Sequence, residues 1–146
     1  MTSHRSIIAI PFLATQPKLK SNIGWPRKGN LMTILILEDE PIIAVDLEEI
    51  VCSCQYGNVV VAATLSDALR YVAESGGDID FALLDLQLGR DGTTSLPLAR
   101  LLMRSNVPFC FVSATTEAIP TDMNAVPQIA KPFEPAEIEA VLPLAA

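Results

Sequence analysis

Five short apolar runs recur along the chain from residue 33 onward, and stretches with helical spacing separate them. The runs have the length of β-strands, and most are apolar throughout, which is typical of strands covered on both faces. They comprise residues 33–37 (TILIL), 58–63 (NVVVAA), 80–84 (DFALL), 108–112 (PFCFV) and, more weakly, 127–130 (PQIA). This alternation of strand and helix predicts an α/β domain, and a five-stranded parallel sheet is its simplest arrangement.

The intervening stretches carry apolar residues at the spacing of one helical face. The expected faces are Ile43, Leu47 and Ile50 in residues 41–54, Leu65, Ala68, Leu69 and Val72 in residues 64–75, and Leu98, Leu101 and Leu102 in residues 93–105. Glu48 and Glu49 then lie elsewhere on the first helix. Ser66 is the expected N-cap of the second helix, and Pro97 must lie in the first turn of the third.

The first 31 residues contain three prolines and two glycines without sustained periodicity. We therefore expect an irregular basic leader, residues 1–31, ahead of a single domain, residues 32–146. Met32 would make a natural N-terminus, so an alternative hypothesis is that the leader is absent from the native protein. Residues 1–31 contain five Lys and Arg and no Asp or Glu. Residues 32–146 contain the other five Lys and Arg and all 17 Asp and Glu. That acidic balance argues against nucleic-acid binding and suits a cation site.

The cysteines and the hydropathy of the chain indicate what kind of protein and which compartment to expect. Cys52, Cys54 and Cys110 lie in or beside apolar runs and are expected to be buried free thiols, because no set of metal ligands surrounds them. No apolar run approaches the roughly 18 residues of a membrane span. Because nothing here demands an oxidising compartment, we expect a cytoplasmic protein.

Polar residues that can carry chemistry follow four of the five runs. Glu38 and Asp39 come after the first run, Asp85 after the third, Ser113 after the fourth and Lys131 after the fifth. In an open parallel sheet the carboxyl ends of the strands form the edge where ligands bind. We therefore expect these residues, which are far apart in the sequence, to converge on one crevice.

Three carboxylates in one crevice would repel one another and raise one another's pKa unless a divalent cation kept them ionised. Oxygen ligands without nearby His or Cys favour magnesium over a transition metal. Asp85 stands between leucines and is the acid best placed to act as a nucleophile. Lys131 supplies a positive charge and Ser113 a hydroxyl donor, so the group that all of them suit is a phosphoryl group.

Each of these residues also has a purely structural explanation. Acids after a strand often stabilise a helix N-terminus, and an isolated Asp or Ser is more often a turn or cap residue. Glu40, which precedes Pro41, is interpreted in this way, as part of the first turn of a helix. The functional interpretation depends on the conjunction of four strand ends, each with a suitable charge.

The motifs LILEDEP, DFALLDLQLGRDG, PFCFVSAT and AKPF resemble those of the receiver domains of two-component response regulators, over residues 33 to about 142. This resemblance implies a doubly wound, flavodoxin-like, five-stranded parallel sheet in the order 2-1-3-4-5. By the same resemblance, Asp85 matches the phosphoacceptor, Glu38 and Asp39 the acidic pair that holds Mg²⁺, Gln87 a backbone-carbonyl ligand of the metal, Ser113 the switch Ser/Thr and Lys131 the phosphate-binding lysine.

The resemblance further implies that Asp85 accepts a phosphoryl group from a phosphohistidine of a sensor histidine kinase or a histidine phosphotransfer protein. The receiver would catalyse this Mg²⁺-dependent transfer itself and would slowly lose the phosphoryl group, without otherwise being an enzyme. Phosphate on Asp85 would draw Ser113 inward and shift the loop behind it. Because no effector domain follows in the sequence, we expect a stand-alone receiver that signals to an unidentified downstream protein by contact, with a homodimer as one option and no membrane or nucleic-acid partner.

Several features depart from the family pattern. Glu38 replaces the usual first Asp, and Gln128 stands where an aromatic switch residue is usual. The segment before Lys131 is short and contains two prolines, which predicts a shortened fourth helix. Pro143 curtails the last helix, expected within residues 134–146.

Two alternative functions follow from these departures and from the acidic site. A phosphorylation-independent interaction module with the same fold would account for Glu38 and Gln128. A magnesium-dependent phosphohydrolase would need a second acid two residues after its nucleophile. Gln87 occupies that position and cannot donate a proton in the same way, which disfavours the phosphohydrolase.

Overall fold

The computed structural model describes residues 4–7, 32–54, 57–75, 78–115 and 119–143. In chain order its elements are β1 (His4–Ile7), β2 (Thr33–Leu37), α2 (Pro41–Ser53), β3 (Asn58–Ala62), α3 (Leu65–Ser75), β4 (Phe81–Leu84), α4 (Leu96–Arg104), β5 (Phe109–Ser113), the 3-10 helix η3 (Thr121–Met123), β6 (Gln128–Ala130) and α5 (Pro135–Val141). Strand and helix alternate from β2 to α5, as the sequence predicts.

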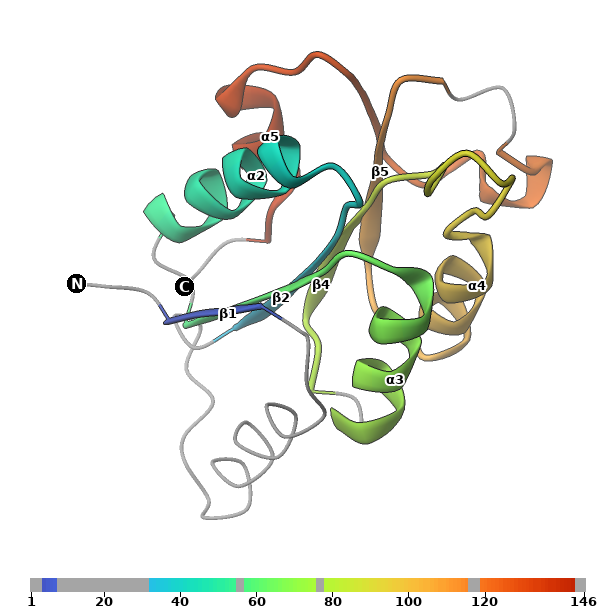
Figure 1. The fold of residues 1–146 in the computed structure, drawn as a ribbon, viewed down its shortest axis with the longest axis horizontal. Coiled ribbons are helices and arrows are strands. Elements are labelled where there is room, and N and C mark those ends of the chain that lie inside the picture. The colour runs from blue at the N-terminus through green and yellow to red at the C-terminus, as the bar shows by residue number, and fades with distance from the viewer. Residues whose placement is uncertain (1–3, 8–31, 55–56, 76–77, 116–118, 144–146) are drawn as a thin grey trace.

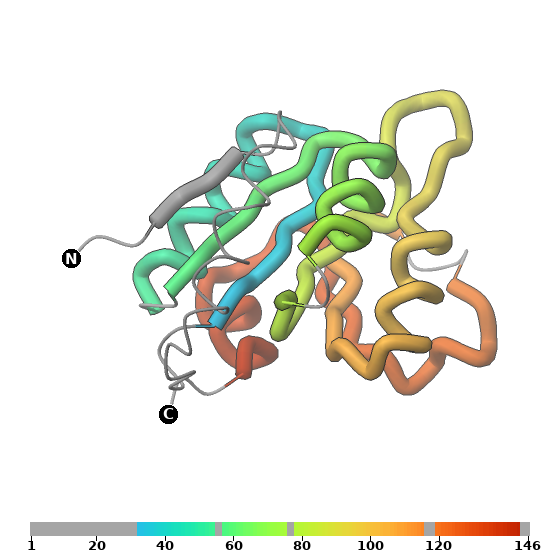
Figure 2. Tube along the Cα trace, turned by 90° about the horizontal axis from the view of Figure 1, so that it is seen from below, coloured from blue at the N-terminus to red at the C-terminus, as the bar shows by residue number. Residues whose placement is uncertain are grey.

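All the strands lie in one parallel sheet, in the order β1-β3-β2-β4-β5-β6. Counted from β2, the five strands β2 to β6 have the predicted order 2-1-3-4-5, and Figures 1 and 2 show β2 lying between β3 and β4. The doubly wound, flavodoxin-like sheet is therefore confirmed.

The sixth strand, β1, is a correction to the sequence prediction. Residues 4–7 pair in parallel with the outer edge of β3, in register from His4 opposite Asn58 to Ile7 opposite Val61. The prediction of an irregular leader is wrong at these four residues, because the open edge of β3 supplies hydrogen-bond partners that no local pattern reveals. The rest of the predicted leader lies outside the described residues.

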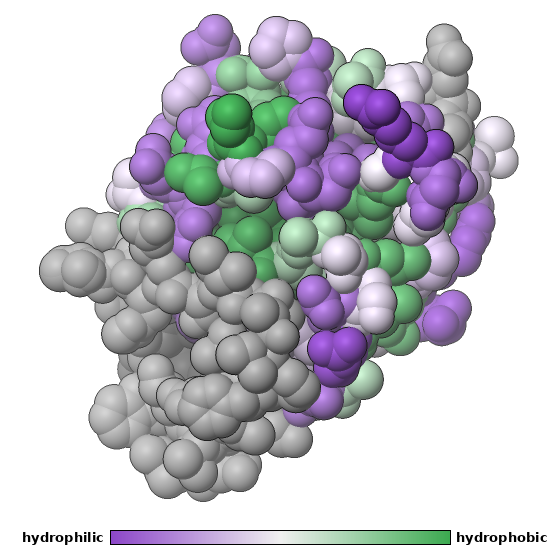
Figure 3. All heavy atoms as spheres, in the orientation of Figure 1, coloured by the Kyte–Doolittle hydropathy of each residue, from purple (hydrophilic) through white to green (hydrophobic). Residues whose placement is uncertain are grey.

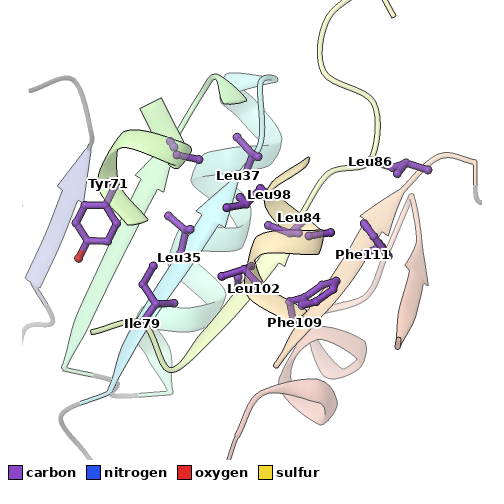
Figure 4. Packing of buried hydrophobic residues seen from close by; sticks show 14 of the residues in the cluster. Leu35, Leu37, Tyr71, Ile79, Leu84, Leu86, Leu98, Leu102, Phe109 and Phe111 are labelled. Carbon is purple, nitrogen blue, oxygen red and sulfur yellow. The ribbon is translucent and has the colours of Figure 1, made fainter. Parts of the chain in front are cut away.

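Helices cover the sheet on both faces, and the strands alternate their side chains between the two layers (Figure 1). Leu35 and Leu37 of β2 face the layer of α3 and α4, whereas Ile34 and Ile36 face the layer of α2 and α5. Figure 4 shows the first cluster, in which Leu84 lies close to Leu98 and Leu102 of α4. Phe111 of β5 and Tyr71 of α3 belong to the same core. Burial on both sides explains why the strands are apolar throughout.

The structure confirms the predicted position of Pro97 and corrects two details of the helices, the N-cap of α3 and the position of Glu48. Pro97 lies in the first turn of α4, as predicted. The N-cap of α3 is Thr64, not Ser66, because the Thr64 Oγ1 atom accepts a hydrogen bond of 3.1 Å from the Asp67 N–H. Glu48 of α2 is only 3% exposed and lies among the buried residues of the helix, although the sequence pattern places it off the apolar face.

The crossover from β5 to β6 is short, as the two prolines predict. Among its described residues, 114–115 and 119–127, the only helical element is η3. Met123 of η3 is fully buried and fixes this turn to the α3 and α4 side of the core. An exposed ion pair of 2.8 Å between Arg100 Nη1 and Asp122 Oδ2 also ties it to α4. The last helix, α5, carries a capping box of Glu134 and Glu137 and ends before Pro143.

Hydrophilic and hydrophobic residues are interspersed on the visible described surface in Figure 3, and one of the hydrophobic areas lies on the side of α2 and α5. Ile42 and Val45 of α2 are the large apolar residues exposed on that helix, at 83% and 48%. No helix in the described part of the chain is long and apolar enough to cross a membrane. All three cysteines are free, but only Cys110 is buried, whereas Cys52 and Cys54 are half-buried at the end of α2.

Leu102 and Met103 of α4 offer a matched test of the packing. Leu102 is fully buried and Met103 is 40% exposed. Leu102→Ala should lower the free energy of unfolding by about 2–5 kcal/mol, because it leaves a cavity under the sheet, whereas Met103→Ala should cost less than about 1 kcal/mol. Urea unfolding followed by circular dichroism measures both. Equal losses would contradict the position of α4 against the sheet.

Candidate functional site

The five residues predicted from the strand ends all lie at the carboxyl edge of the sheet. Three of them are the first residue beyond a strand, and their backbone N–H groups close the last bonds of the ladder. The Glu38 N–H donates to the Ala62 carbonyl at 3.1 Å, the Asp85 N–H to the Leu37 carbonyl at 2.8 Å and the Lys131 N–H to the Ser113 carbonyl at 3.1 Å. The sheet therefore fixes the backbone from which each of these side chains projects.

The acidic side chains meet above β2 and β4. Carboxylate oxygens of Glu38, Asp39 and Asp85 lie within 4.8 Å of one another. Lys131 reaches this group from the end of β6, with its Nζ atom 2.9 Å from Glu38 Oε1 and 3.3 Å from Asp85 Oδ2. Exposed Glu40 lies at the limit of contact, with its Oε1 atom 4.0 Å from Lys131 Nζ. One ammonium thus faces three clustered carboxylates.

Burial makes this arrangement electrostatically costly. Asp85 is only 6% exposed, and burial, followed by the charge of Glu38, raises its pKa to about 7 although Lys131 opposes the rise. Burial lowers the pKa of Lys131, but its contact with Glu38 and the charge of Asp85 outweigh that effect and raise the pKa overall. The site therefore stabilises the ammonium form of Lys131 and destabilises the Asp85 carboxylate, which an additional cation would relieve.

Glu38 supplies the observation that tests whether such a cation fits. Its Oε2 atom accepts a hydrogen bond of 3.1 Å from the Glu40 N–H. Its buried Oε1 atom lies 2.9 Å from the ammonium of Lys131 and makes no aligned hydrogen bond among the described residues. A buried carboxylate that lies next to two further carboxylates, with only one ammonium nearby, belongs to a donor set that suits Mg²⁺.

Asp39 is tied to the loop between β4 and α4, a contact that the sequence did not predict. Its Oδ2 atom accepts a hydrogen bond of 2.9 Å from the Gly89 N–H. Gly89 has φ +78°, a backbone conformation that only glycine adopts without strain. The glycine itself is therefore the sequence feature that could have pointed to this contact. Gln87, the expected carbonyl ligand, lies in the same loop in an antiparallel bridge with Thr94.

Ser113 and Gln128 lie at the margin of the site. Ser113 is 2% exposed, and its hydroxyl accepts a hydrogen bond of 3.3 Å from the Thr115 N–H. No contact among the described residues joins this hydroxyl to Asp85. Gln128 is exposed at the start of β6, opposite Phe111 of β5. The structure thus brings Glu38, Asp39, Asp85 and Lys131 together and places Ser113 beside Lys131.

Comparisons with known proteins find relatives for most of the chain. The family model described as "Response regulator receiver domain" matches residues 34–143. The phyllosphere-induced regulator PhyR of Methylorubrum extorquens is 38% identical over 112 residues, which cover 75% of this chain and 41% of PhyR. The chain therefore spans less than half the length of that relative.

Solved structures show the same fold. The solution structure of SdrG from Sphingomonas melonis Fr1 is 32% identical, covers 80% of this chain and 97% of that one, and has a TM-score of 0.67. A structure described as the BeF3-activated conformation of SdrG from Pseudomonas melonis Fr1 is also 32% identical, covers 75% and 92% of the two chains, and has a TM-score of 0.60.

The raised pKa of Asp85 predicts a pH-dependent stability in the absence of divalent cations. Folded Asp85 keeps its proton up to about pH 7, whereas in the unfolded chain it loses the proton near the ordinary aspartate pKa of 3.8. The folded state therefore binds more protons between these two values, so stability falls as the pH rises through that window. Asp85→Asn removes this loss and should stabilise the protein by about 1–3 kcal/mol at pH 8, with a gain that shrinks toward pH 4.

Urea unfolding in EDTA at pH 5 and pH 8 measures the difference between the two proteins. Asp122→Asn is the control, because Asp122 is exposed and its pKa is lowered by the hydrogen bond with Arg100. A gain from Asp85→Asn that stays constant between the two pH values would show that Asp85 is already ionised at pH 5.

Proposed function

This chain belongs to the family of response regulator receiver domains, and from that premise we propose that Asp85 accepts a phosphoryl group in a Mg²⁺-dependent reaction. The donor is a phosphohistidine of a sensor histidine kinase or of a histidine phosphotransfer protein. One observation carries the proposal: the buried Asp85 carboxylate lies 3.3 Å from Lys131 Nζ and within 4.8 Å of two other carboxylates. This combination suits a nucleophile that must take up a dianionic group.

The transfer forms one bond and breaks another. An oxygen of the Asp85 carboxylate attacks phosphorus, the N–P bond of the phosphohistidine breaks, and the imidazole nitrogen keeps the bonding electron pair and takes up a proton. Lys131 stabilises the negative charge on the phosphoryl oxygens, which develops close to its ammonium. The Ser113 hydroxyl can donate to a phosphoryl oxygen after it turns away from Thr115.

Glu38, Asp39 and Asp85, with the backbone carbonyl of Gln87, are the residues that would hold Mg²⁺. When bound, the ion supplies positive charge that neutralises the clustered carboxylates and the incoming phosphoryl oxygens. The clustering of carboxylate oxygens of Glu38, Asp39 and Asp85 within 4.8 Å of one another supports this assignment. A relative supports the proposed phosphoryl acceptance, since SdrG has a conformation described as BeF3-activated, and trifluoroberyllate coordinated by an oxygen is tetrahedral, like a phosphoryl group.

The protein acts in two-component signalling, and we propose that it passes its signal by contact with a downstream protein, in the cytoplasm. Phosphorylation would change the surface around Ser113 and the β5–β6 crossover, where η3 is the only helical element among the described residues. Apart from its own phosphorylation and slow dephosphorylation, we assign it no enzymatic reaction. Gln87, two residues beyond Asp85, has an amide that cannot serve as the general acid of a phosphohydrolase.

A phosphorylation-independent interaction module is the alternative. Two observations favour it: the close pairing of Lys131 with Glu38 and the exposed Gln128 at the position of the usual switch aromatic. In that case a partner would bind the wild-type protein and Asp85→Asn equally well, whatever the phosphodonor.

Incubation with acetyl phosphate and Mg²⁺, followed by intact-mass measurement, tests the proposed reaction. The wild type should gain one phosphoryl group and Asp85→Asn none, because the nucleophile is lost. Lys131→Met should take up the group about 100-fold more slowly, as expected when one preorganised donor to the transition state is removed.

Asp122→Asn serves as the matched control, since it also neutralises an aspartate but lies in an exposed ion pair on η3. It should be phosphorylated at the wild-type rate. Undiminished uptake by Asp85→Asn, or no uptake by the folded wild type from either acetyl phosphate or a phosphohistidine protein, would overturn the proposal.

A further inference from the structure

The outer edge of β3 holds a strand that comes from far away in the sequence. Residues 4–7 form β1 at one border of the sheet (Figure 1), and the 25 residues 8–32 separate it from β2. Among the described elements, β1 has its main contacts with β3 and α2. The place of this strand in the fold therefore depends on its pairing with β3.

We propose that the outer edge of β3 is a strand-binding site that accepts residues 4–7 from a second copy of this chain as well as from its own. Two copies that exchange their β1 strands form a reciprocal dimer with two identical contacts. The residues at the carboxyl edge of the sheet take no part in these contacts, so the exchange does not depend on the proposed phosphorylation.

Backbone pairing is what this site offers to a strand. On its inner side β3 pairs with β2 from Asn58 to Ala62, and on its outer side it pairs with β1 from Asn58 to Val61. Without β1, alternate residues of β3 would leave their N–H and C=O groups open along an apolar strand, and extended chains bind to edges of this kind. The same parallel bonds form whether the strand belongs to the same chain or to another.

The connection between β1 and β2 is long enough for the exchange. Ile7 lies opposite Val61 and Thr33 lies opposite Asn58 on the two sides of β3. Two strand spacings and three residues along the strand therefore separate the ends of the connection, a distance of about 14 Å. A chain of 25 residues reaches about 80 Å when it is extended. This length is far more than closure within one copy needs, and it suffices to reach a neighbouring copy.

Charge favours the same occupant. Residues 1–31 contain five Lys and Arg and no Asp or Glu. The two helices on one face of the sheet, α2 and α5, contain five Asp and Glu and no Lys or Arg. Because β1 lies against α2, this part of the domain attracts a basic N-terminal segment, whichever copy carries it.

The protein concentration decides which copy supplies the strand. A tether of about 25 residues gives the strand at its end an effective concentration on the order of 1 mM at its own binding site. A second copy competes on equal terms only when its own concentration approaches that value. The exchanged dimer should therefore be rare at micromolar concentrations and should include about half of the molecules near 1 mM.

Small-angle X-ray scattering of the full chain tests the exchange. Its average mass should rise about 1.5-fold between about 50 µM and about 1 mM, as a half-dimeric sample requires. Arg5→Pro and Ser6→Pro are matched variants, because only alternate residues of an edge strand turn their N–H toward the neighbouring strand. One variant should lose the rise in mass, and the other, whose missing N–H faces away from β3, should keep it.

A mass that stays that of a monomer up to 1 mM overturns the proposal, and so does a rise that both proline variants retain. An equal mixture of ¹⁵N-labelled and ¹³C-labelled wild-type chains distinguishes exchange from other ways of joining. Exchange gives NOE contacts between residues 4–7 of one chain and residues 59–61 of another. Contacts between the β1 strands of two chains instead would show that the copies join at the outer edge of β1, and they overturn the exchange.

A peptide of residues 1–10 measures the binding of the strand directly. The full-length proline variant that loses the dimer has an open β3 edge, so the peptide should bind it with a Kd of about 1 mM or less. The wild type at 50 µM, whose edge is occupied, should bind the peptide at least tenfold more weakly, and a peptide of scrambled sequence should bind neither protein. Shifts of the amide signals of residues 59–61 report the binding. Equal binding by the variant and the wild type, or none by the variant, overturns the proposed site.

Discussion

The charge balance around Asp85 is the constraint on which the rest of the structure depends. Three carboxylates gather within 4.8 Å, and Lys131 supplies the one ammonium that the described contacts bring to them. Such a cluster raises the energy of the folded state unless cations compensate it, so the fold must be stable enough to hold it. The two apolar layers, which cover every strand from β2 to β5, provide that stability.

The parallel sheet also determines how accurately the charged groups are placed. Each of Glu38, Asp85 and Lys131 follows a strand directly, and each donates its backbone N–H to a neighbouring strand. The chemistry therefore sits at the ends of the strands, whereas Gly89 and Ser113 connect it to the β4–α4 loop and to the start of the β5–β6 crossover. A change in charge at Asp85 can reach the molecular surface by way of these loops.

Much of this organisation could be predicted because it follows from periodic patterns. The apolar runs locate β2 to β6, and the polar residues after them locate the site. The rest depends on tertiary contacts. Thr64 and Ser66 are equally good cap residues in isolation, and only the true start of α3 decides between them. The burial of Glu48, the pairing of β1 and the bond from Gly89 to Asp39 join segments that no local pattern relates.

The all-parallel pairing of the strands has a consequence for how the chain folds. Ile34 of β2 lies opposite both Val59 of β3 and Phe81 of β4, so neither neighbour of this central strand is available until a whole crossover has formed. Closing such loops lowers the entropy of the chain before any hydrogen bond between strands can compensate for it. Topologies of this kind fold comparatively slowly. Until the first crossover has formed, the apolar faces of β2 can contact other chains. The rate at which that crossover forms therefore determines how long these faces stay exposed.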